Sequence, residues 1–116
     1  GARISAAEHR EILRARAALR SSFARRLAEY PLWLMPTVPC VAPRVDELGE
    51  DTAYFEANRL ILRNTALVNF LDGCAVTLPC HEPGGLPVGV SLVAQAGMDR
   101  QLLGAAAHLE AVARSM

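Results

Sequence analysis

The chain has 116 residues, enough for one modest domain or for a piece of a larger one. A hydrophobic content of 52% argues against disorder, while no stretch reaches the roughly 18 uninterrupted apolar residues that a membrane span needs. Twelve arginines balance twelve acidic residues and lysine is absent, so the overall charge indicates neither a nucleic-acid partner nor a membrane surface.

The cellular compartment is indicated by the N-terminus and the cysteines. The opening sequence GARISAAEHREILRARAALR is charged and lacks the apolar centre of a secretory signal. Cys40, Cys74 and Cys80 are odd in number and irregularly spaced, which favours reduced thiols over a disulfide framework. We therefore expect a cytoplasmic protein.

The first predicted element is a helix over about residues 5–30. Ser5 followed by Glu8 forms a capping-box pattern at its start, and Pro31 ends it. Apolar residues at helical spacing predict one stripe that packs against the protein: Ile12, Leu19, Phe23, Leu27 and Tyr30. Most arginines fall on the other faces, among glutamates, which favours a solvated surface over binding of a polyanion.

A short apolar run, Leu32 to Met35, predicts a strand buried on both faces. A proline-rich loop follows, and residues 52–71 predict a helix that is apolar on almost all sides from Leu60 onward. Asn64-Thr65 marks a break in this helix, with Asn64 as the cap of a second, shorter one.

Two further strands and a helix complete the pattern. Asp72-Gly73 ends the preceding helix, and Cys74 to Leu78 predicts a second doubly buried strand, parallel to the first because a helical crossover joins them. Val88 to Gln95 predicts a third strand, antiparallel to the second because their connection is short. The last helix, residues 99–114, is expected to face the sheet through Leu102, Leu103, Ala106, Leu109 and Val112.

The fold class predicted from these elements is α/β, with a mixed, mainly parallel sheet and flanking helices. The buried-type strands and the apolar helix require more covering protein than the chain supplies. We therefore expect an incomplete part of a larger fold, whose apolar surface makes the isolated chain self-associate.

Four segments occur in a characteristic order along the chain: LMPTVPCVAP, NTALVNFLDGCAVTLPC, GGLPVGVSLVAQ and GMDRQLLGAAAHLEA. In order and approximate spacing they resemble the C-terminal part of amidase signature enzymes, over roughly residues 32–113. The resemblance implies a C-terminal portion of an amidohydrolase that hydrolyses carbon–nitrogen bonds of a small-molecule amide. Residues 1–116 then form a single segment, with a helix at about 5–30 and strand–helix–strand–strand–helix at about 32–114.

The resemblance also indicates which catalytic groups the chain lacks. Family members use a serine nucleophile, a second serine and a lysine base, with the nucleophile in a Gly/Ser-rich stretch. This sequence has no lysine and no such stretch, and neither Ser21-Ser22 nor Ser91 matches the nucleophile. We expect no catalytic residue in this chain, the Ser-Ser-Lys groups lying N-terminal to Gly1.

The turn Cys80-His81-Glu82 is the other candidate site. Because the ends of parallel strands line clefts, Thr37, Cys40, Cys80 and His81 are expected to contribute to the wall of the substrate pocket, with a purely structural loop as the alternative. A metal site of Cys40, Cys80, His81 and Glu82 lacks diagnostic spacing, and adjacent Cys80 and His81 cannot readily share a hydrogen bond. No metal and no cofactor are expected.

Two other classes of function stay open. The chain could be a non-catalytic assembly module that associates through its exposed sheet edge and apolar faces. It could also be a small Cys/His metal-binding protein. For the amidase interpretation, the expected partners are the amide substrate of the intact enzyme and further copies of the isolated chain, with no nucleic acid and no membrane.

Overall fold

The computed structural model describes residues 3–114, and the two residues at each end lie outside this range. Its elements in chain order are α1 (Ala6–Glu29), β1 (Trp33–Pro36), the 3-10 helix η1 (Val45–Leu48), α2 (Asp51–Phe70), β2 (Cys74–Pro79), β3 (Gly89–Ala94) and α3 (Asp99–Arg114). The predicted helices and strands are thus found close to their expected bounds. The short helix η1 lies in the segment predicted to be a loop.

The sheet has three strands in the order β1-β3-β2, and both pairings are antiparallel. The antiparallel hairpin of β2 and β3 is confirmed, whereas a mainly parallel sheet is wrong. β1 and β2 do run in the same direction, but β3 lies between them. The helical crossover through α2 therefore skips one position in the sheet, and the hairpin fills that position with an antiparallel strand.

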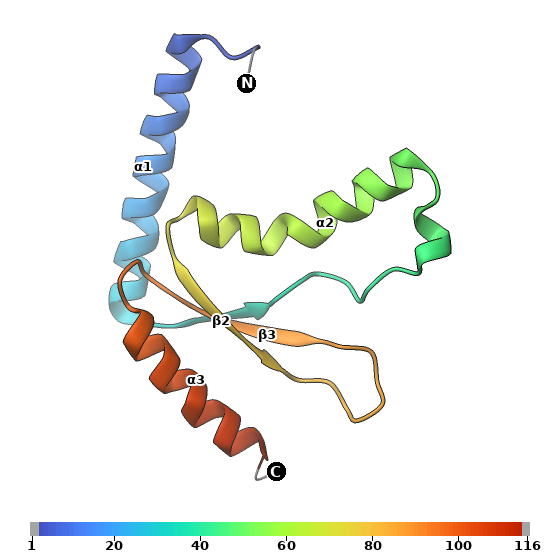
Figure 1. Ribbon diagram of the computed structural model, residues 1–116. Helices are drawn as coiled ribbons and strands as arrows, with labels where there is room; N and C mark the ends of the chain where they lie inside the picture. The colour runs from blue at the N-terminus through green and yellow to red at the C-terminus, as the bar shows by residue number, and fades with distance from the viewer. Residues whose placement is uncertain (1–2, 115–116) are drawn as a thin grey trace.

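Helices cover both faces of the sheet, because successive strand residues point to opposite sides. On one face, Leu92 and Ala94 pack against Leu102 of α3. On the other face, Met35 and Val93 pack against Val68 of α2, and Phe23 of α1 with Trp33 borders this cluster. Figure 1 shows α3 on one side of the strands and α2 on the other, with α1 alongside.

The distribution of burial corrects two expectations. The strand buried on both faces is β3, whose Leu92 and Val93 are 1% and 0% exposed, and not β1 or β2. β2 alternates half-buried and exposed residues, and Leu34 of β1 is 59% exposed, because both strands lie at edges of the sheet. The predicted helix faces are also only partly buried. Leu27, Leu102 and Ala106 are buried, whereas exposed positions include Ile12, Leu19, Tyr30, Leu103, Leu109 and Val112.

Helix α2 is continuous across Asn64-Thr65, so the predicted break is wrong. The Asn64 side chain does not cap a helix. Its Nδ2 atom donates a hydrogen bond to the carbonyl oxygen of Pro36, at 2.8 Å. This bond ties the middle of α2 to the end of β1, which fixes the height of the helix above the sheet.

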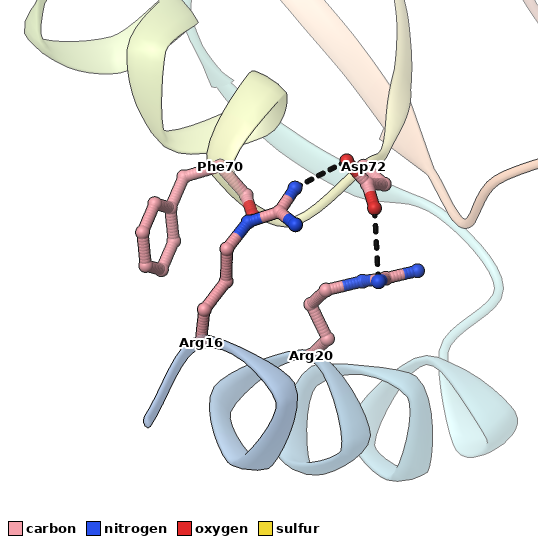
Figure 2. Close-up of polar contacts among 4 residues, drawn as sticks. All are labelled: Arg16, Arg20, Phe70 and Asp72. Atoms are coloured by element: carbon pink, nitrogen blue, oxygen red, sulfur yellow. Dashed lines mark hydrogen bonds and ion pairs between the residues drawn. The ribbon is translucent and has the colours of Figure 1, made fainter. Parts of the chain in front are cut away.

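Two arginines of α1 hold the C-terminal end of α2 (Figure 2). Arg16 pairs with Asp72 and donates from Nε to the Phe70 carbonyl oxygen at 2.9 Å, while Arg20 lies 3.0 Å from the other Asp72 carboxylate oxygen. The Arg16 guanidinium also lies over the Phe70 ring, 5.6 Å from its centroid. Asp72 adopts a left-handed φ of 54°, which ends the helix as the sequence predicts.

The molecule is flat and open. Its radius of gyration is 17.5 Å, whereas a compact chain of this length has about 13 Å. Its accessible surface is 8914 Å², whereas a compact monomer of this mass has about 6,200 Å². Much of the additional surface is apolar, because large hydrophobic side chains along α1 and α2 remain exposed.

Candidate functional site

Three hydroxyl groups meet on the sheet face below α2. Ser91 Oγ lies 2.8 Å from Thr37 Oγ1 and 3.1 Å from Thr77 Oγ1, and the two threonine oxygens are 3.3 Å apart. The strand register explains the meeting, because Thr77 pairs directly with Ser91, and Thr37 follows the last residue of β1. The three residues, named here the hydroxyl cluster, come from three different strands or strand ends.

A glycine makes room for the hydroxyl cluster. A Cβ atom at Gly89 would lie 2.7 Å from Thr77 Cγ2, closer than real Cβ contacts allow, and 3.0 Å from Thr37 Oγ1, which is tighter than most such contacts. The backbone carbonyl of Gly89 also accepts a hydrogen bond from the Thr37 N–H at 2.9 Å. Gly89 therefore brings the end of β1 against β3 and leaves the two threonine side chains free to approach Ser91.

The hydroxyl cluster borders a half-open cleft of about 300 Å³ between the sheet and α2. Met35, Val68 and Ala75 contribute apolar lining, and Thr65 and Asn69 of α2 contribute polar lining. The lining residues, all uncharged, are Met35, Thr37, Thr65, Val68, Asn69, Gly73, Ala75, Thr77 and Ser91. A cleft of this composition can hold a neutral group that is polar on one side and apolar on the other.

The residues predicted for the pocket wall lie around the same end of the sheet, because β1 and β2 run in the same direction. Thr37 belongs to the hydroxyl cluster and lines the cleft. Cys40 is half-buried in the loop after β1, whereas Cys80 and His81 are exposed after β2 and do not line this cleft. The Cys80 N–H donates to the Val88 carbonyl at 2.9 Å, which continues the hairpin.

The His81 ring turns back on its own hairpin. Its Nδ1 atom lies 3.5 Å from the backbone nitrogen of Val88, which is positioned to donate to it. This contact is long and exposed, so it orients the ring without burying it. The structure therefore assigns Cys80 and His81 a place in a solvent-facing turn, and their contribution to a substrate pocket stays a prediction.

Comparison with known proteins identifies the family. The sequence model of the family described as Amidase matches residues 2–103. The chain belongs to the amidase family. It is 34% identical over 106 residues to 2-amino-5-chloromuconic acid deaminase of Comamonas testosteroni, an alignment that covers 88% of this chain and 23% of that protein.

Two other curated relatives support membership of the same family. Indoleacetamide hydrolase of Pantoea agglomerans pv. gypsophilae is 35% identical over 104 residues, which is 87% of this chain and 22% of the hydrolase. Amidase 1 of Oryza sativa subsp. japonica is 37% identical over 89 residues, which is 76% of this chain and 20% of the rice protein. The chain thus spans less than a quarter of the length of these relatives. No solved structure matches it.

Ser91, the serine at the centre of the hydroxyl cluster, has no base beside it in the described part of the chain. Ser91 is only 5% exposed, and its hydroxyl contacts the hydroxyls of Thr37 and Thr77. Threonine hydroxyls cannot remove its proton near neutral pH, so this serine stays a weak nucleophile. Residues 3–114 also contain no group of three His, Cys, Asp or Glu side chains arranged to hold a metal ion.

Thr77, Ser91 and Asn69 are the site residues that sequence reasoning missed. The signal was present in part, because Thr77 and Ser91 are polar residues inside the otherwise apolar runs CAVTLP and VGVSLVAQ. A polar side chain in a buried strand needs a hydrogen-bond partner. The identity of that partner depended on the register between strands, which the sequence does not display.

Proposed function

We propose that this chain is the C-terminal portion of an amidohydrolase that hydrolyses the carbon–nitrogen bond of a small-molecule amide. The match to the amidase family over residues 2–103 in a chain without lysine is the observation that carries the proposal. The resemblance to amidase signature enzymes requires a lysine base, so the Ser-Ser-Lys groups are placed on polypeptide outside this sequence. The isolated chain is accordingly expected to be inactive.

The proposal gives this chain the role of a scaffold and pocket wall. Thr37, Cys40, Cys80 and His81 follow two strands that end at the same side of the sheet. Loops at the end of a rigid sheet commonly line substrate pockets. Placement of the protein in the cytoplasm is supported by three free cysteines, which suit a reducing compartment. Among residues 3–114, no helix has the length and apolarity required to cross a membrane.

A segment exchange tests the enzymatic proposal. Residues 3–114 would replace the matching segment of the Pantoea indoleacetamide hydrolase, and hydrolysis of indoleacetamide would be measured. We expect turnover well above that of the hydrolase with the segment deleted. A Gly89→Val substitution in the chimera should reduce turnover by disrupting the hydroxyl cluster, whereas Gly49→Val, at a position with open space, should not.

The intact mass of the protein in its source gives an independent check. A polypeptide far longer than 116 residues, with this sequence at its C-terminal end, is the expected result. A folded chimera without any turnover, together with a source protein of only 116 residues, would contradict the proposal. The alternative of a non-catalytic assembly module would then be favoured, since exposed apolar side chains along α2 provide a surface for association.

A further inference from the structure

A second cleft, of about 360 Å³, lies between α1 and the turns that lead into β2 and α3. Among its lining residues, Phe23, Ala24 and Leu71 are apolar and half-buried, whereas Arg20 and Ser21 are exposed at its edge. β2 begins just after this cleft and passes the hydroxyl cluster near its other end. The two sites therefore occupy opposite ends of the sheet.

The edge of this second cleft carries an excess of positive charge. Arg16 and Arg20 share the carboxylate of Asp72, so two positive charges face one negative charge (Figure 2). Arg16 is further engaged, because it donates to the Phe70 carbonyl oxygen and lies over the Phe70 ring. Arg20 places only Nη1 near Asp72, at 3.0 Å, and has no further hydrogen-bond partner in residues 3–114. Its other N–H groups are available to a ligand.

Ser21 adds a hydroxyl donor on the same edge. Arg25 donates from Nη1 to Ser21 Oγ at 3.1 Å, which leaves the serine proton for a different acceptor. This contact also holds a third guanidinium group close to the cleft, while no carboxylate is among the lining residues. Guanidinium and hydroxyl donors together are suited to the oxygen atoms of an anion.

The inner part of the cleft selects for an apolar body. Gln95 Nε2 donates to the Ala24 carbonyl oxygen at 3.1 Å, which ties α1 to the turn after β3 and fixes the walls relative to each other. Phe23 and Leu71 line the space between them and stay partly accessible. A hydrophobic group placed there removes apolar surface from water. A bare inorganic anion does not gain this contribution.

We propose that the cleft edged by Arg20 and Ser21 is a binding site for a small hydrophobic monocarboxylate. The ligand carboxylate accepts from the Arg20 guanidinium and the Ser21 hydroxyl, and its hydrocarbon part packs against Phe23 and Leu71. The inference goes beyond the proposed function and does not depend on it, because this cleft lies at the end of the sheet opposite the predicted pocket wall.

Titration of the ¹⁵N-labelled 116-residue chain with benzoate near neutral pH tests the proposal by NMR. We expect saturable shifts of the Arg20 side-chain Nε–H signal and of the backbone signals of Ser21, Ala24 and Gln95. Benzyl alcohol is the matched probe, because it has the same ring and no charge. It should give no comparable shifts. Inorganic phosphate supplies charge without an apolar body and should bind at least tenfold more weakly than benzoate.

A pair of arginine variants tests the charge. Arg20→Gln removes the free guanidinium, while Asp72 keeps its pairing with Arg16. The dissociation constant for benzoate should rise by about three- to tenfold, as for loss of a charge-assisted hydrogen bond at a partly exposed site. Arg10→Gln removes the same charge about 15 Å away along α1. It should change the constant by less than about twofold.

A pair of alanine variants tests the cleft without altering charge. Ala17 lines the cleft and is exposed, so Ala17→Met should obstruct the cleft and weaken benzoate binding by at least about threefold without disturbing the fold. Ala18 is equally exposed but does not line the cleft. Ala18→Met should therefore leave the affinity unchanged.

Four outcomes would overturn the inference. They are the absence of a localised saturable shift with benzoate, equal shifts with benzyl alcohol, equal affinity for phosphate, and variants at Arg20 and Ala17 that both behave like their controls. Equal affinity for phosphate would show that the arginines attract any anion and that the apolar walls contribute nothing.

Discussion

Asp72 is the residue on which the junction of α1, α2 and β2 depends. Its backbone occupies the left-handed region, which non-glycine residues rarely adopt, and its carboxylate meets both Arg16 and Arg20. Aspartate and asparagine tolerate this conformation better than other side chains do. The residue thus combines a backbone role with an electrostatic one, and the two can be separated by substitution.

Asp72→Ala should lower the free energy of unfolding by about 2 kcal/mol, because it loses the ion pairs and places alanine at an unfavourable φ. Asp72→Asn should lower it by less than about 1 kcal/mol, since the pairs are partly exposed and asparagine accepts the conformation. Urea unfolding of the three proteins measures the difference. Equal losses in both variants would show that the backbone conformation contributes nothing.

Glu8 makes a pH-dependent contribution to the stability of the first turn of α1. Its Oε2 atom accepts hydrogen bonds from the Ser5 backbone N–H and hydroxyl, both at 2.8 Å, and the backbone bond is the larger cause of a lowered Glu8 pKa. A lowered pKa in the folded state stabilises the helix above the unfolded pKa, and this stabilisation is lost as the pH falls through the folded value.

We therefore predict that the Glu8 carboxyl titrates below its ordinary pKa and that the first turn of α1 loses helicity on acidification. Side-chain and backbone ¹³C NMR shifts measure both effects. Glu8→Gln is the matched control, because glutamine preserves the reciprocal hydrogen bond of a capping box without titrating. A Glu8 pKa at or above the ordinary value would contradict the structure of this cap.

At the level of elements, the sequence predicted the helices, strands and helix ends, which depend on neighbouring residues. It did not predict the order in which the strands pair in the sheet. The capping box at Ser5 and the helix end at Asp72-Gly73 depend on neighbouring residues, and both were found. The position of β3 between β1 and β2 depends on pairing across long loops, which no local pattern encodes. Burial followed from that position, so the strand buried on both faces is β3, whereas the sequence pattern predicts such burial for the segments that form β1 and β2.

The residues of the candidate site were likewise only partly predictable from the sequence. Cys80-His81-Glu82 combines three side chains that can react or bind metal, yet it lies in an exposed turn. The hydroxyl cluster arises from residues distant in sequence, Thr37 and Ser91 among them, that the strand register brings together. Thr37 was anticipated from its place at a strand end. Its hydrogen-bond partners Thr77 and Ser91 could not be anticipated, because the sequence does not show how the strands are aligned with one another.

The turn from α2 into β2 provides a matched pair of glycines for a stability test. A Cβ atom at Gly73 would lie 2.9 Å from the Ala94 carbonyl oxygen and 3.2 Å from Val68 Cγ1, in the interior of the sheet. Gly49 has nothing within 4 Å and an ordinary helical φ of -68°. Substitution of glycine by alanine should therefore change stability in opposite directions at the two positions.

Gly73→Ala should destabilise the protein by about 1–3 kcal/mol, because a backbone oxygen in a buried strand cannot move aside easily. Gly49→Ala should be neutral or stabilising by up to about 1 kcal/mol, since it restricts the unfolded chain without strain in the folded one. Thermal and urea unfolding compare the two. A neutral Gly73→Ala would mean that β2 and β3 can separate at this end without cost.

At the scale of the whole molecule, the open shape is the dominant property. The accessible surface of 8914 Å² exceeds that of a compact monomer by about 2,700 Å², more than the 1,200–2,000 Å² or so buried in total in a standard protein–protein interface. The exposed apolar side chains concentrate on α2, where they include Tyr54, Phe55, Leu60, Leu62, Leu67 and Phe70. We propose that in the intact enzyme this face packs against the remaining polypeptide.

In the isolated chain the same face should associate with further copies. At about 25 cal/mol per Å², a few hundred Å² of apolar surface gives a substantial driving force for association. Light scattering across a dilution series should therefore show a mass that rises with concentration.

Leu62→Glu should lower the association, because it places a charge on the exposed face of α2, where Leu62 is 51% exposed. Val45→Glu, on η1, is the control for added charge, and it should leave association nearly unchanged. A single monomeric species at every concentration, with a cooperative melt, would show that the core closes within this chain. The open surface of α2 would then need no partner, and the chain would be a complete domain.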